Sequence, residues 1–434
     1  MGCSCSSSQP TIEPKKQQVQ PVQQVAQDRR RLTVGSIEEP GSETAKPTED
    51  PEQASGQNAP TSDEQPEAET TPKAQENEPA DEEDVERGLI TNVHAADVLQ
   101  MLDVRSAGRT RWSVGSGEDL GLTTFANKNI LHIGDELDPL KHGLGFTCRK
   151  GLKPESPNQD SWSVLKIDQD LSIYGVYDGH GQKGHDVSNF VKENLPKLIL
   201  GDNRLKGDQM PQMLHDAFLG MQRMVIDMDD NHFLNAQLSG TTASVVIHDH
   251  VKNKITVSHV ADSTVVLGRF ISADRNPSQL EAVQLTRDHK PDLPDERQRI
   301  EDAGGRVVFD GYSNHRVYAR NARYPGLNMS RCLGDLLGHS QAGCSCTPEV
   351  SERDVTDLDH VLLVCSDGVW EFISPQEAVN IISEYGSGMA MVAANKLAQA
   401  AWDRWVSHEG GVVVDDITVV LIYLQHGKPA AELK

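Results

Sequence analysis

Aromatic residues are scarce in this chain and are missing altogether from its first quarter. Phe, Trp and Tyr make up 5% of the 434 residues, and none of them precedes Trp112. A segment without aromatic side chains and with few other apolar ones buries too little surface to offset the conformational entropy lost on folding. We therefore expect no compact domain in that first quarter.

Long apolar runs and regularly spaced cysteines are also missing. No stretch approaches the roughly eighteen consecutive apolar residues of a transmembrane helix, and no apolar signal segment is present. The seven cysteines show no paired spacings, which favours a reduced, cytosolic setting over a disulfide framework. Cys344 and Cys346 lack a second Cys/His pair at the spacing that a zinc site requires, which argues against metal binding there.

Positive charge is in short supply as well. The chain holds 41 Lys and Arg against 65 Asp and Glu, a net charge of −24. Residues 37–86 contribute −15 from seventeen acidic residues and two lysines, and residues 1–36 contribute +3, which leaves −12 for residues 87–434. The acidic segment, filled out with Pro, Gln, Ser and Thr, is typical of a disordered linker. The acidic remainder argues against nucleic acid as a partner.

The first six residues, MGCSCS, carry a lipidation pattern. Gly2 follows the initiator Met and a serine stands at position six, which is the signature of N-myristoylation. A single acyl chain anchors a protein only marginally, so a second signal is needed. Cys3 and Cys5 are placed to carry palmitoyl thioesters, and nearby Lys and Arg clusters would add attraction to anionic lipid. The sequence therefore predicts a cytoplasmic protein held peripherally on the cytosolic face of a membrane.

These changes in composition divide the chain into five segments. From the N-terminus we expect a lipid-anchoring head (1–36), an acidic disordered linker (37–88), a connecting segment (89–140), a folded domain (141–426) and a C-terminal tail (427–434). The connecting segment holds a helix candidate, NVHAADVLQMLDVR, and then a short basic stretch. We expect this segment to pack against the domain as an embellishment.

Within the folded domain, strands and helices occur in adjacent pairs. Apolar and β-branched runs predict the strands, and apolar residues at helical spacing predict the helices. Ser374 and Glu377 form a capping box with Pro at the first helical position. This order favours an α+β fold, with antiparallel sheets flanked by helix pairs, over a parallel βαβ fold. The predicted strands are 161–167, 171–178, 241–248, 254–262, 263–270, 360–366 and 417–424, and the predicted helices are 184–200, 212–228, 375–385 and 390–405.

Four aspartates stand at the tips of these strands, far apart in the sequence. Asp160 and Asp415 each precede a strand, and Asp178 and Asp367 each follow one. A single aspartate at a strand end is typical of a turn. Four of them beside strong strands supply the oxygen ligands that hard cations such as Mg²⁺ and Mn²⁺ require. Gly179 lets the backbone approach closely, so its carbonyl can join the same ligand set.

Five short motifs follow one another along residues 141–426. They are YDGHG (177–181), SGTTA (239–243), SRCLGD (330–335), CSDGVWEF (365–372) and DDITVV (415–420). In this order they resemble the signature of the PP2C (PPM) family of metal-dependent protein serine/threonine phosphatases. The resemblance implies an α-β-β-α sandwich, with two central antiparallel sheets between helix pairs and a binuclear Mn²⁺ or Mg²⁺ centre at one end. It assigns the metal shell to the four strand-end aspartates and the carbonyl of Gly179.

The same resemblance implies hydrolysis by a water that the two cations hold and activate, without a protein nucleophile. In agreement, the chain has no Cys-x5-Arg segment that could form a phosphocysteine. His180 is the candidate general acid for the serine or threonine leaving group, because it stands beside the metal ligands in YDGHG. Alternatively, His180 caps the helix that follows. His185, on that helix, is expected to be structural.

The sequence departs from the family pattern at the phosphate-binding position. Family members often place an Arg shortly before the first metal Asp, whereas this chain offers Arg149, Lys150 and Lys153. We favour Lys153, because KGLKPESPNQD resembles a family variant with a basic residue at that turn. A lysine holds phosphate as a point charge, without the two-pronged contact of arginine.

Further departures concern the surroundings of the metals. Gln159 stands where many family members have Glu, and Asp416 replaces a common Asn beside Asp415. The family's weaker third metal site corresponds to Asp262 and Glu371, where the usual GDSR is ADST and the usual Asp is Glu. The four main carboxylates are intact, so we expect activity with an altered dependence on metal.

The sequence therefore predicts a lipid-anchored phosphatase that removes phosphate from phosphoserine and phosphothreonine in phosphoprotein substrates, as a monomer with two cations per active site. One rival interpretation is a weakly active or inactive scaffold of the same fold that binds phosphoproteins. Another is a metal-dependent hydrolase of small phosphoesters. The segment 288–329 is expected to form a flap beside the site, and its basic residues would favour acidic or phosphorylated substrates.

Overall fold

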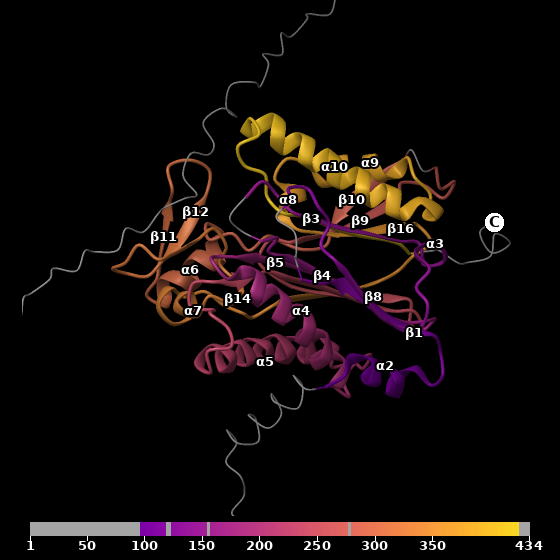
Figure 1. Cartoon of the computed structure of the whole chain (residues 1–434), viewed down its shortest axis with the longest axis horizontal. Helices are drawn as coiled ribbons and strands as arrows, with labels where there is room; N and C mark the ends of the chain where they lie inside the picture. The colour runs from indigo at the N-terminus through magenta and orange to yellow at the C-terminus, as the bar shows by residue number, and fades with distance from the viewer. Residues whose placement is uncertain (1–95, 119–122, 154–156, 277–278, 425–434) are drawn as a thin grey trace, which may run out of the picture.

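Two antiparallel sheets pack face to face, and helices cover both outer faces (Figure 1). The computed structural model describes residues 96–118, 123–153, 157–276 and 279–424. The predicted α-β-β-α sandwich is confirmed. The predicted head, acidic linker and C-terminal tail lie outside these ranges. Within them, every helix is too short or too polar to cross a lipid bilayer.

The first sheet is built around the predicted hairpin of β4 (Asp160–Ile167) and β5 (Leu171–His180). These strands pair from Asp160 opposite Asp178 to Ile167 opposite Leu171. The strand order is β15-β8-β7-β5-β4-β1-β2, and the short β6 pairs with both β5 and β14. The other strands of this sheet are β1 (Arg111–Ser116), β2 (Ile130–Gly134), β6 (Gly240–Thr241), β7 (Ala243–Asp249), β8 (Lys254–Val260), β14 (Leu333–Gly334) and β15 (Glu349–Asp354).

The second sheet has the strand order β10-β9-β16-β17-β3, with antiparallel neighbours throughout. Its inner face shares one apolar core with the inner face of the first sheet. The rings of Phe146 and Trp162, one from each sheet, stack there with their centroids 4.4 Å apart. Both sheets are covered on both faces, which explains why their strands read as nearly continuous apolar runs. The strands are β3 (Leu144–Arg149), β9 (Thr264–Phe270), β10 (Leu280–Gln284), β16 (Asp359–Cys365) and β17 (Ile417–Tyr423).

One helix pair covers each outer face, as predicted (Figure 1). The long helices α4 (Gly184–Gly201) and α5 (Met210–Asp230) lie on the first sheet and bury their apolar stripes in one core cluster. The helices α9 (Pro375–Ser383) and α10 (Ala390–Glu409) lie on the second sheet and share another cluster with it. The 3.6-residue periodicity in the sequence reflects this one-sided burial.

Local signals set where these helices begin and end. Ser374 Oγ accepts the N–H of Glu377 at 3.2 Å, so the predicted N-cap of α9 forms, whereas the Glu377 carboxylate pairs with Arg404. The helix α10 ends where Gly410 adopts a left-handed φ of +63°, which glycine adopts without steric cost. The remaining short helices of the two layers are α3 (Pro139–His142), α8 (Asp367–Trp370) and the 3-10 turn η1 (Ser387–Met389).

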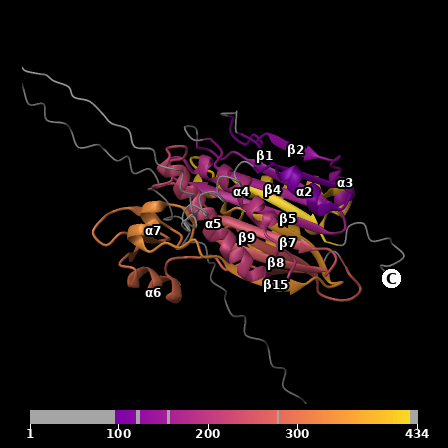
Figure 2. The same ribbon diagram turned by 90° about the horizontal axis from the view of Figure 1, so that it is seen from below.

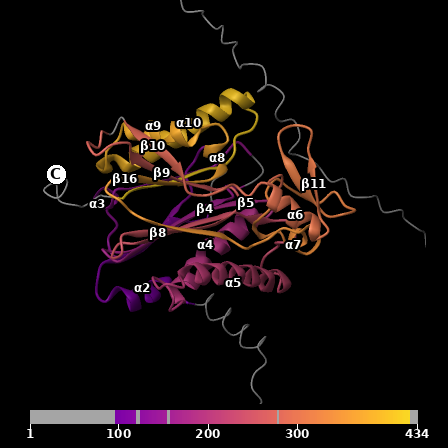
Figure 3. The same ribbon diagram turned by 180° about the vertical axis from the view of Figure 1, so that it is seen from behind.

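A small third unit projects beyond one end of the two sheets (Figures 2 and 3). It has its own three-stranded antiparallel sheet in the order β11-β12-β13 and its own apolar cluster. It contains most of the segment 288–329, for which a flap is predicted. Its elements are α6 (Pro294–Asp302), β11 (Arg306–Phe309), β12 (His315–Tyr318), β13 (Pro325–Leu327) and α7 (Leu336–Ala342).

The described part of the connecting segment belongs to the main fold. The helix α2 (Val98–Ser106) places Leu102 in the core beneath the first sheet. Arg105 donates from Nε to the Leu200 carbonyl at 2.6 Å and from Nη2 to the Asp202 carbonyl at 2.7 Å, so it satisfies carbonyls at the end of α4. The strand β1 pairs with β4, and β2 pairs with β1. This segment therefore extends the sheet, whereas the sequence predicted only a packed embellishment.

Candidate active site

Strand direction brings the four strand-end aspartates to one end of the sandwich. In the first sheet, Asp160 at the start of β4 lies opposite Asp178 near the end of β5. In the second sheet, Asp367 follows β16 and Asp415 precedes β17, and these two strands are antiparallel neighbours. Antiparallel pairing places the end of one strand beside the start of the next, so each sheet delivers two carboxylates to one edge.

Hydrogen bonds join the two pairs across the sheets. Asp160 Oδ2 accepts from Ser366 Oγ and from Thr418 Oγ1, both at 2.7 Å. Ser366 directly precedes Asp367, and Thr418 lies on β17 three residues after Asp415. The convergence of distant aspartates that the sequence predicts is therefore present in the structure.

Burial and mutual repulsion raise the pKa values of these carboxyl groups. Burial and then the charge of Asp416 raise the pKa of Asp160 to about 6. Burial and then the charge of Asp415 raise the pKa of Asp367 to about 8. The pKa of Asp178 lies well above its usual range, because of burial and then the charges of the other three strand-end aspartates. The cluster therefore holds more negative charge than its protein surroundings compensate.

These residues fit the hard divalent cations that the family resemblance implies. The donors are carboxylate and carbonyl oxygens, which Mg²⁺ and Mn²⁺ prefer. Asp160 Oδ1 is buried and has no hydrogen-bond partner among the described residues. A Cβ at Gly179 would lie 2.4 Å from the Gly184 carbonyl oxygen and 2.6 Å from the Gln159 carbonyl oxygen, so this turn requires glycine.

Asp416 and Gln159 hold the strand ends around the cluster. The two carboxylate oxygens of Asp416 accept the N–H groups of Gly151 at 2.7 Å and Gln159 at 2.8 Å. An asparagine could accept only one of these two hydrogen bonds through its single carbonyl oxygen, which gives the aspartate at this position a structural reason. The Gln159 amide donates to the Gly181 carbonyl at 2.7 Å and so fixes the turn after His180.

Of the three candidate phosphate-binding residues, Lys153 lies beside the carboxylates. Its Nζ pairs with the carboxylate of Asp415. Lys150 is buried and donates to the Lys153 carbonyl at 2.7 Å, which supports the backbone of that turn. The guanidinium of Arg149 donates to Asn395 Oδ1 of α10 at 2.7 Å, in the helix layer above the second sheet. The geometry therefore favours Lys153 among the three.

The two candidate ligands of a third metal differ in their surroundings. Asp262 is buried and adds to the repulsion that raises the pKa values of Asp178 and Asp367. Its Oδ2 pairs with Lys290, a residue for which the sequence gave no role. Glu371 is exposed at the end of α8, where its N–H donates to the Asp367 carbonyl at 2.9 Å. Asp262 thus belongs to the cluster, with an ammonium group as its present counter-charge.

His180 lies at the rim of the cluster and contacts a buried aspartate. Its Nε2 lies 2.5 Å from Asp335 Oδ2, and the Asp335 side chain is fully buried. Burial alone would lower the pKa of His180, but the charge of Asp335 outweighs it and the pKa is raised. The alternative role as a helix cap is wrong, because α4 begins at Gly184 with Lys183 at its N-cap position and without a side-chain cap.

Sequence reasoning missed four residues that shape the site, although three of them lie in the quoted motifs. Ser366 and Thr418 hold Asp160, and Asp335 holds His180. Lys290 lies near the start of the predicted flap segment and outside every quoted motif, so only the fold brings it to Asp262. For Ser366, Thr418 and Asp335, the available signal was their position inside the quoted motifs.

A second group of metal-binding residue types lies away from the carboxylates. One ligand atom each of His259, His289 and Glu349 lies within 4.8 Å of the others. However, His289 Nδ1 accepts the N–H of Ala261 at 3.0 Å, which leaves the proton of a neutral ring on Nε2, the nitrogen facing Glu349. The guanidinium of Arg287 also pairs with Glu349. A protonated nitrogen and a nearby cation disfavour a metal there, so this group links β8, β15 and the flap through ring stacking and ion pairs.

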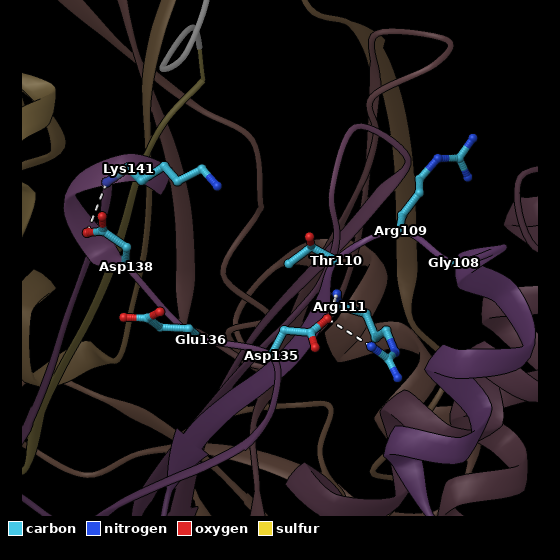
Figure 4. Close-up of a pocket in the computed structure, with 8 residues that line it drawn as sticks. All are labelled: Gly108, Arg109, Thr110, Arg111, Asp135, Glu136, Asp138 and Lys141. Atoms are coloured by element: carbon cyan, nitrogen blue, oxygen red, sulfur yellow. Dashed lines mark hydrogen bonds and ion pairs between the residues drawn. The ribbon is translucent and has the colours of Figure 1, made fainter.

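The pocket drawn in Figure 4 lies at the opposite end of the first sheet. It is lined by residues 108–111, before and at the start of β1, and by Asp135, Glu136, Asp138 and Lys141. Arg111 lies opposite Ile167, seven residues from Asp160 along β4, which corresponds to about 23 Å of strand. Arg111 pairs with Asp135 at 2.9 Å in its wall. This pocket is therefore separate from the carboxylate cluster.

Solved structures share the fold. The crystal structure of serine-threonine phosphatase 2C from Toxoplasma gondii superposes with a TM-score of 0.56 at 21% identity, covering 64% of this chain and 94% of that chain. The structure of a C. elegans sex determining protein superposes with a TM-score of 0.54 at 20% identity, covering 69% of this chain and 68% of that chain. At these identities the likeness concerns the fold.

Sequence comparison extends the likeness to the family. Probable protein phosphatase 2C 72 from Arabidopsis thaliana is 33% identical over 317 residues, which cover 69% of this chain and 92% of that protein. Probable protein phosphatase 2C 48 from Oryza sativa subsp. japonica is 34% identical over 295 residues, which cover 63% of this chain and 81% of that protein. The family model described as protein phosphatase 2C matches residues 153–410, more than half of the chain. The chain belongs to the protein phosphatase 2C family.

Proposed function

We propose that this protein is a metal-dependent phosphatase that hydrolyses phosphoserine and phosphothreonine in proteins. The observation that carries the proposal is the gathering of buried and half-buried carboxylates from both sheets at one edge, with raised pKa values at Asp160, Asp178 and Asp367. Such a cluster is costly unless cations neutralise it, and groups with perturbed pKa values concentrate at functional sites. Asp160, Asp178, the Gly179 carbonyl, Asp367 and Asp415 would hold two Mn²⁺ or Mg²⁺ ions.

When bound, such cations supply an activated water as nucleophile and offset negative charge on the phosphoryl oxygens. The protein contributes orientation. Ser366 and Thr418 fix the carboxylate of Asp160 from the second sheet, so one ligand is held in place before a cation binds. Asp416 fixes the backbone at Gln159, directly before Asp160, and at Gly151, after the end of β3.

Lys153 and His180 serve the substrate. Lys153 lies against Asp415 and supplies a positive charge for the phosphate group, as a single point contact. His180 donates a proton to the serine or threonine oxygen as the bond from phosphorus to that oxygen breaks. An alkoxide is a poor leaving group, so this proton lowers the barrier to cleavage.

Phosphate release from a phosphothreonine peptide tests the proposal. We expect release with Mn²⁺ or Mg²⁺, none after chelation with EDTA, and recovery when the metal is restored. Binding of the peptide without turnover at any metal concentration would instead identify a phosphoprotein-binding scaffold. Fast turnover of small phosphoesters with no turnover of phosphorylated proteins would identify the other rival, a small-molecule hydrolase.

We further propose that acylation tethers the enzyme to the cytosolic face of a membrane. Gly2, Cys3 and Cys5 lie outside the described residues, so the proposal rests on the sequence pattern and on the two-signal requirement for stable anchoring. In cells, Gly2→Ala should move the protein from the membrane fraction to the soluble fraction, and the control Ser7→Ala should leave it on the membrane. Equal membrane recovery of Gly2→Ala and wild type would contradict the tether.

A further inference from the structure

We propose that Asp335 is the positioning residue for His180, holding its ring so that Nδ1 faces the leaving group of the substrate. The proposal rests on the proposed role of His180 as the proton donor. It concerns the last residue of the motif SRCLGD (330–335), for which the sequence predicted no individual role.

The contact between the two side chains leaves His180 with one nitrogen to use. Asp335 Oδ2 lies 2.5 Å from His180 Nε2, so Nε2 donates its proton to this carboxylate. The other ring nitrogen, Nδ1, is buried and has no hydrogen-bond partner among the described residues. A hydrogen bond at one nitrogen determines which nitrogen is left for chemistry. Proton donation by His180 therefore has to occur from Nδ1.

Asp335 is delivered to His180 by a small strand arrangement. Gly240 of β6 lies opposite His180 of β5 on one side and opposite Gly334 of β14 on the other. Asp335 directly follows Gly334, and its N–H donates to the Ser239 carbonyl at 2.9 Å. Because β6 pairs with both strands, the backbones that carry the acid and the imidazole share one rigid support.

Gly240 is also what makes room for the carboxylate. A Cβ at this position would lie 2.1 Å from Asp335 Oδ2, far inside van der Waals contact. Asp335 itself has a φ of +45° and a ψ of 51°, the left-handed region that a residue other than glycine rarely adopts. Strained backbone of this kind persists where the surroundings impose it, and it is common at functional sites.

A purely structural role for the carboxylate fits the contacts less well. Asp335 stands at the N-cap position of α7, yet its side chain makes no capping hydrogen bond. Asp335 Oδ1 is buried without a hydrogen-bond partner among the described residues, and Oδ2 faces His180. The side chain is therefore aimed at the imidazole and leaves the start of the helix uncapped.

The proton balance of the step is simple. As the bond between phosphorus and the seryl or threonyl oxygen breaks, its electron pair stays on that oxygen, which takes the proton from His180 Nδ1. Asp335 keeps its hydrogen bond to Nε2 throughout the step. The attacking water gives its proton to solvent, and solvent returns one to Nδ1 before the next turnover.

The test compares a poor leaving group with a good one. Asp335→Asn keeps the size of the side chain but removes its charge and favours the wrong ring tautomer. We expect its kcat on a phosphothreonine peptide to fall by about 100-fold, the range that proton donation contributes. We expect its kcat on 4-nitrophenyl phosphate to fall less than about 3-fold, because nitrophenolate leaves without help from a proton.

A double-mutant cycle shows whether Asp335 acts through His180. In a His180→Gln background, Asp335→Asn should cause no further loss on the peptide. Asp359→Asn is the matched control, because Asp359 is, like Asp335, a buried aspartate. The partners of Asp359 are arginines, and it lies at the opposite end of β16 from Asp367. This control should change both substrates equally or not at all.

The outcomes separate this inference from the proposed function. An inactive wild type would defeat the proposed function itself. If the wild type is active, three results for Asp335→Asn would overturn the proposed role of Asp335. The variant could hydrolyse both substrates more slowly by the same factor, hydrolyse both at the wild-type rate, or lower the activity further in the His180→Gln background. Circular dichroism and the melting temperature of each variant show whether it is folded. If Asp335→Asn does not fold, Asp335→Glu is assayed in its place, with the same split between substrates expected.

Discussion

At the scale of single residues, catalysis and stability place opposite demands on the carboxylate cluster. The raised pKa values of Asp160, Asp178 and Asp367 mean that, without metal, the ionised side chains repel one another in a buried site. A charge-neutral substitute should relieve that repulsion and at the same time remove a ligand. The same change is therefore expected to harm activity and to help the metal-free fold.

Asp178→Asn tests this trade directly. Phosphate release should fall by at least about 100-fold, because one metal ligand is weakened. In EDTA, the free energy of unfolding should rise by on the order of 1–2 kcal/mol, because one repelling charge is gone. Urea titration with and without metal measures both states. A loss of stability in EDTA would show that the carboxylate is not under repulsion.

Single residues also show how far sequence reasoning reached. Aspartates at strand tips could be predicted because the tip position and the following glycine are local features of the sequence. The role of Asp335 could not, because it depends on meeting His180 across 155 positions of chain through β6. Lys290 was invisible for the same reason, since its partner Asp262 lies on another element.

At the scale of elements, the attachment of α6 to the main fold depends on one buried glutamate. Glu296, in the first turn of α6, accepts from Arg331 Nη2 at 2.5 Å, from Arg299 Nη2 at 2.7 Å and from Ser330 Oγ at 2.5 Å. Burial alone would raise the pKa of Glu296, but these hydrogen bonds outweigh it and lower the pKa to about 2. The glutamate therefore joins the flap to the SRCLGD segment as a charged group.

Glu296→Gln should destabilise the protein by about 3 kcal/mol at pH 7, because the half-buried guanidinium groups of Arg299 and Arg331 lose the charge of this buried carboxylate. A carboxyl group with a lowered pKa stabilises the fold fully above its unfolded pKa of about 4.5 and loses that effect as the pH falls toward 2. The difference between variant and wild type should therefore be constant above about pH 5 and shrink below it. Chemical denaturation at pH 7, 5, 4 and 3 measures this, and a difference independent of pH would contradict it.

Elements also differ in how well the sequence predicted them. Long apolar runs and the Ser374 capping box gave the central strands and α9 from local signals. The strand β1 was missed, because RWSVGS holds only two large apolar residues and becomes a strand through its pairing with β4. Pairing between distant segments is a tertiary effect that a local pattern does not report.

At the scale of the whole molecule, α2 is the first element of the fold within the described residues. Leu102 is buried in the main core, and Arg105 satisfies carbonyls at the end of α4. Removal of residues 1–95 should leave the melting temperature within about 1 °C of the full chain and the activity on a soluble phosphopeptide within about twofold. Removal of residues 1–108 should cost about 3 kcal/mol, from lost apolar burial and two unsatisfied carbonyls, and lower the melting temperature by about 5–10 °C.

Differential scanning calorimetry of the two truncations against the full chain measures the difference. Equal melting temperatures for both truncations would show that α2 is dispensable. A large fall in the melting temperature after removal of residues 1–95 would show that residues before 96 stabilise the fold. The first result would place the start of the stable domain after residue 108, and the second would place it before residue 96.

The helix α4 has a consequence for how a bulky substrate approaches. It spans 18 residues, about 27 Å, from the turn after His180 to the carbonyls that Arg105 holds. The candidate active site and the point where the described chain enters the fold therefore lie at opposite ends of α4. A substrate that docks at the first end therefore lies about one helix length from residue 96, where the described chain begins.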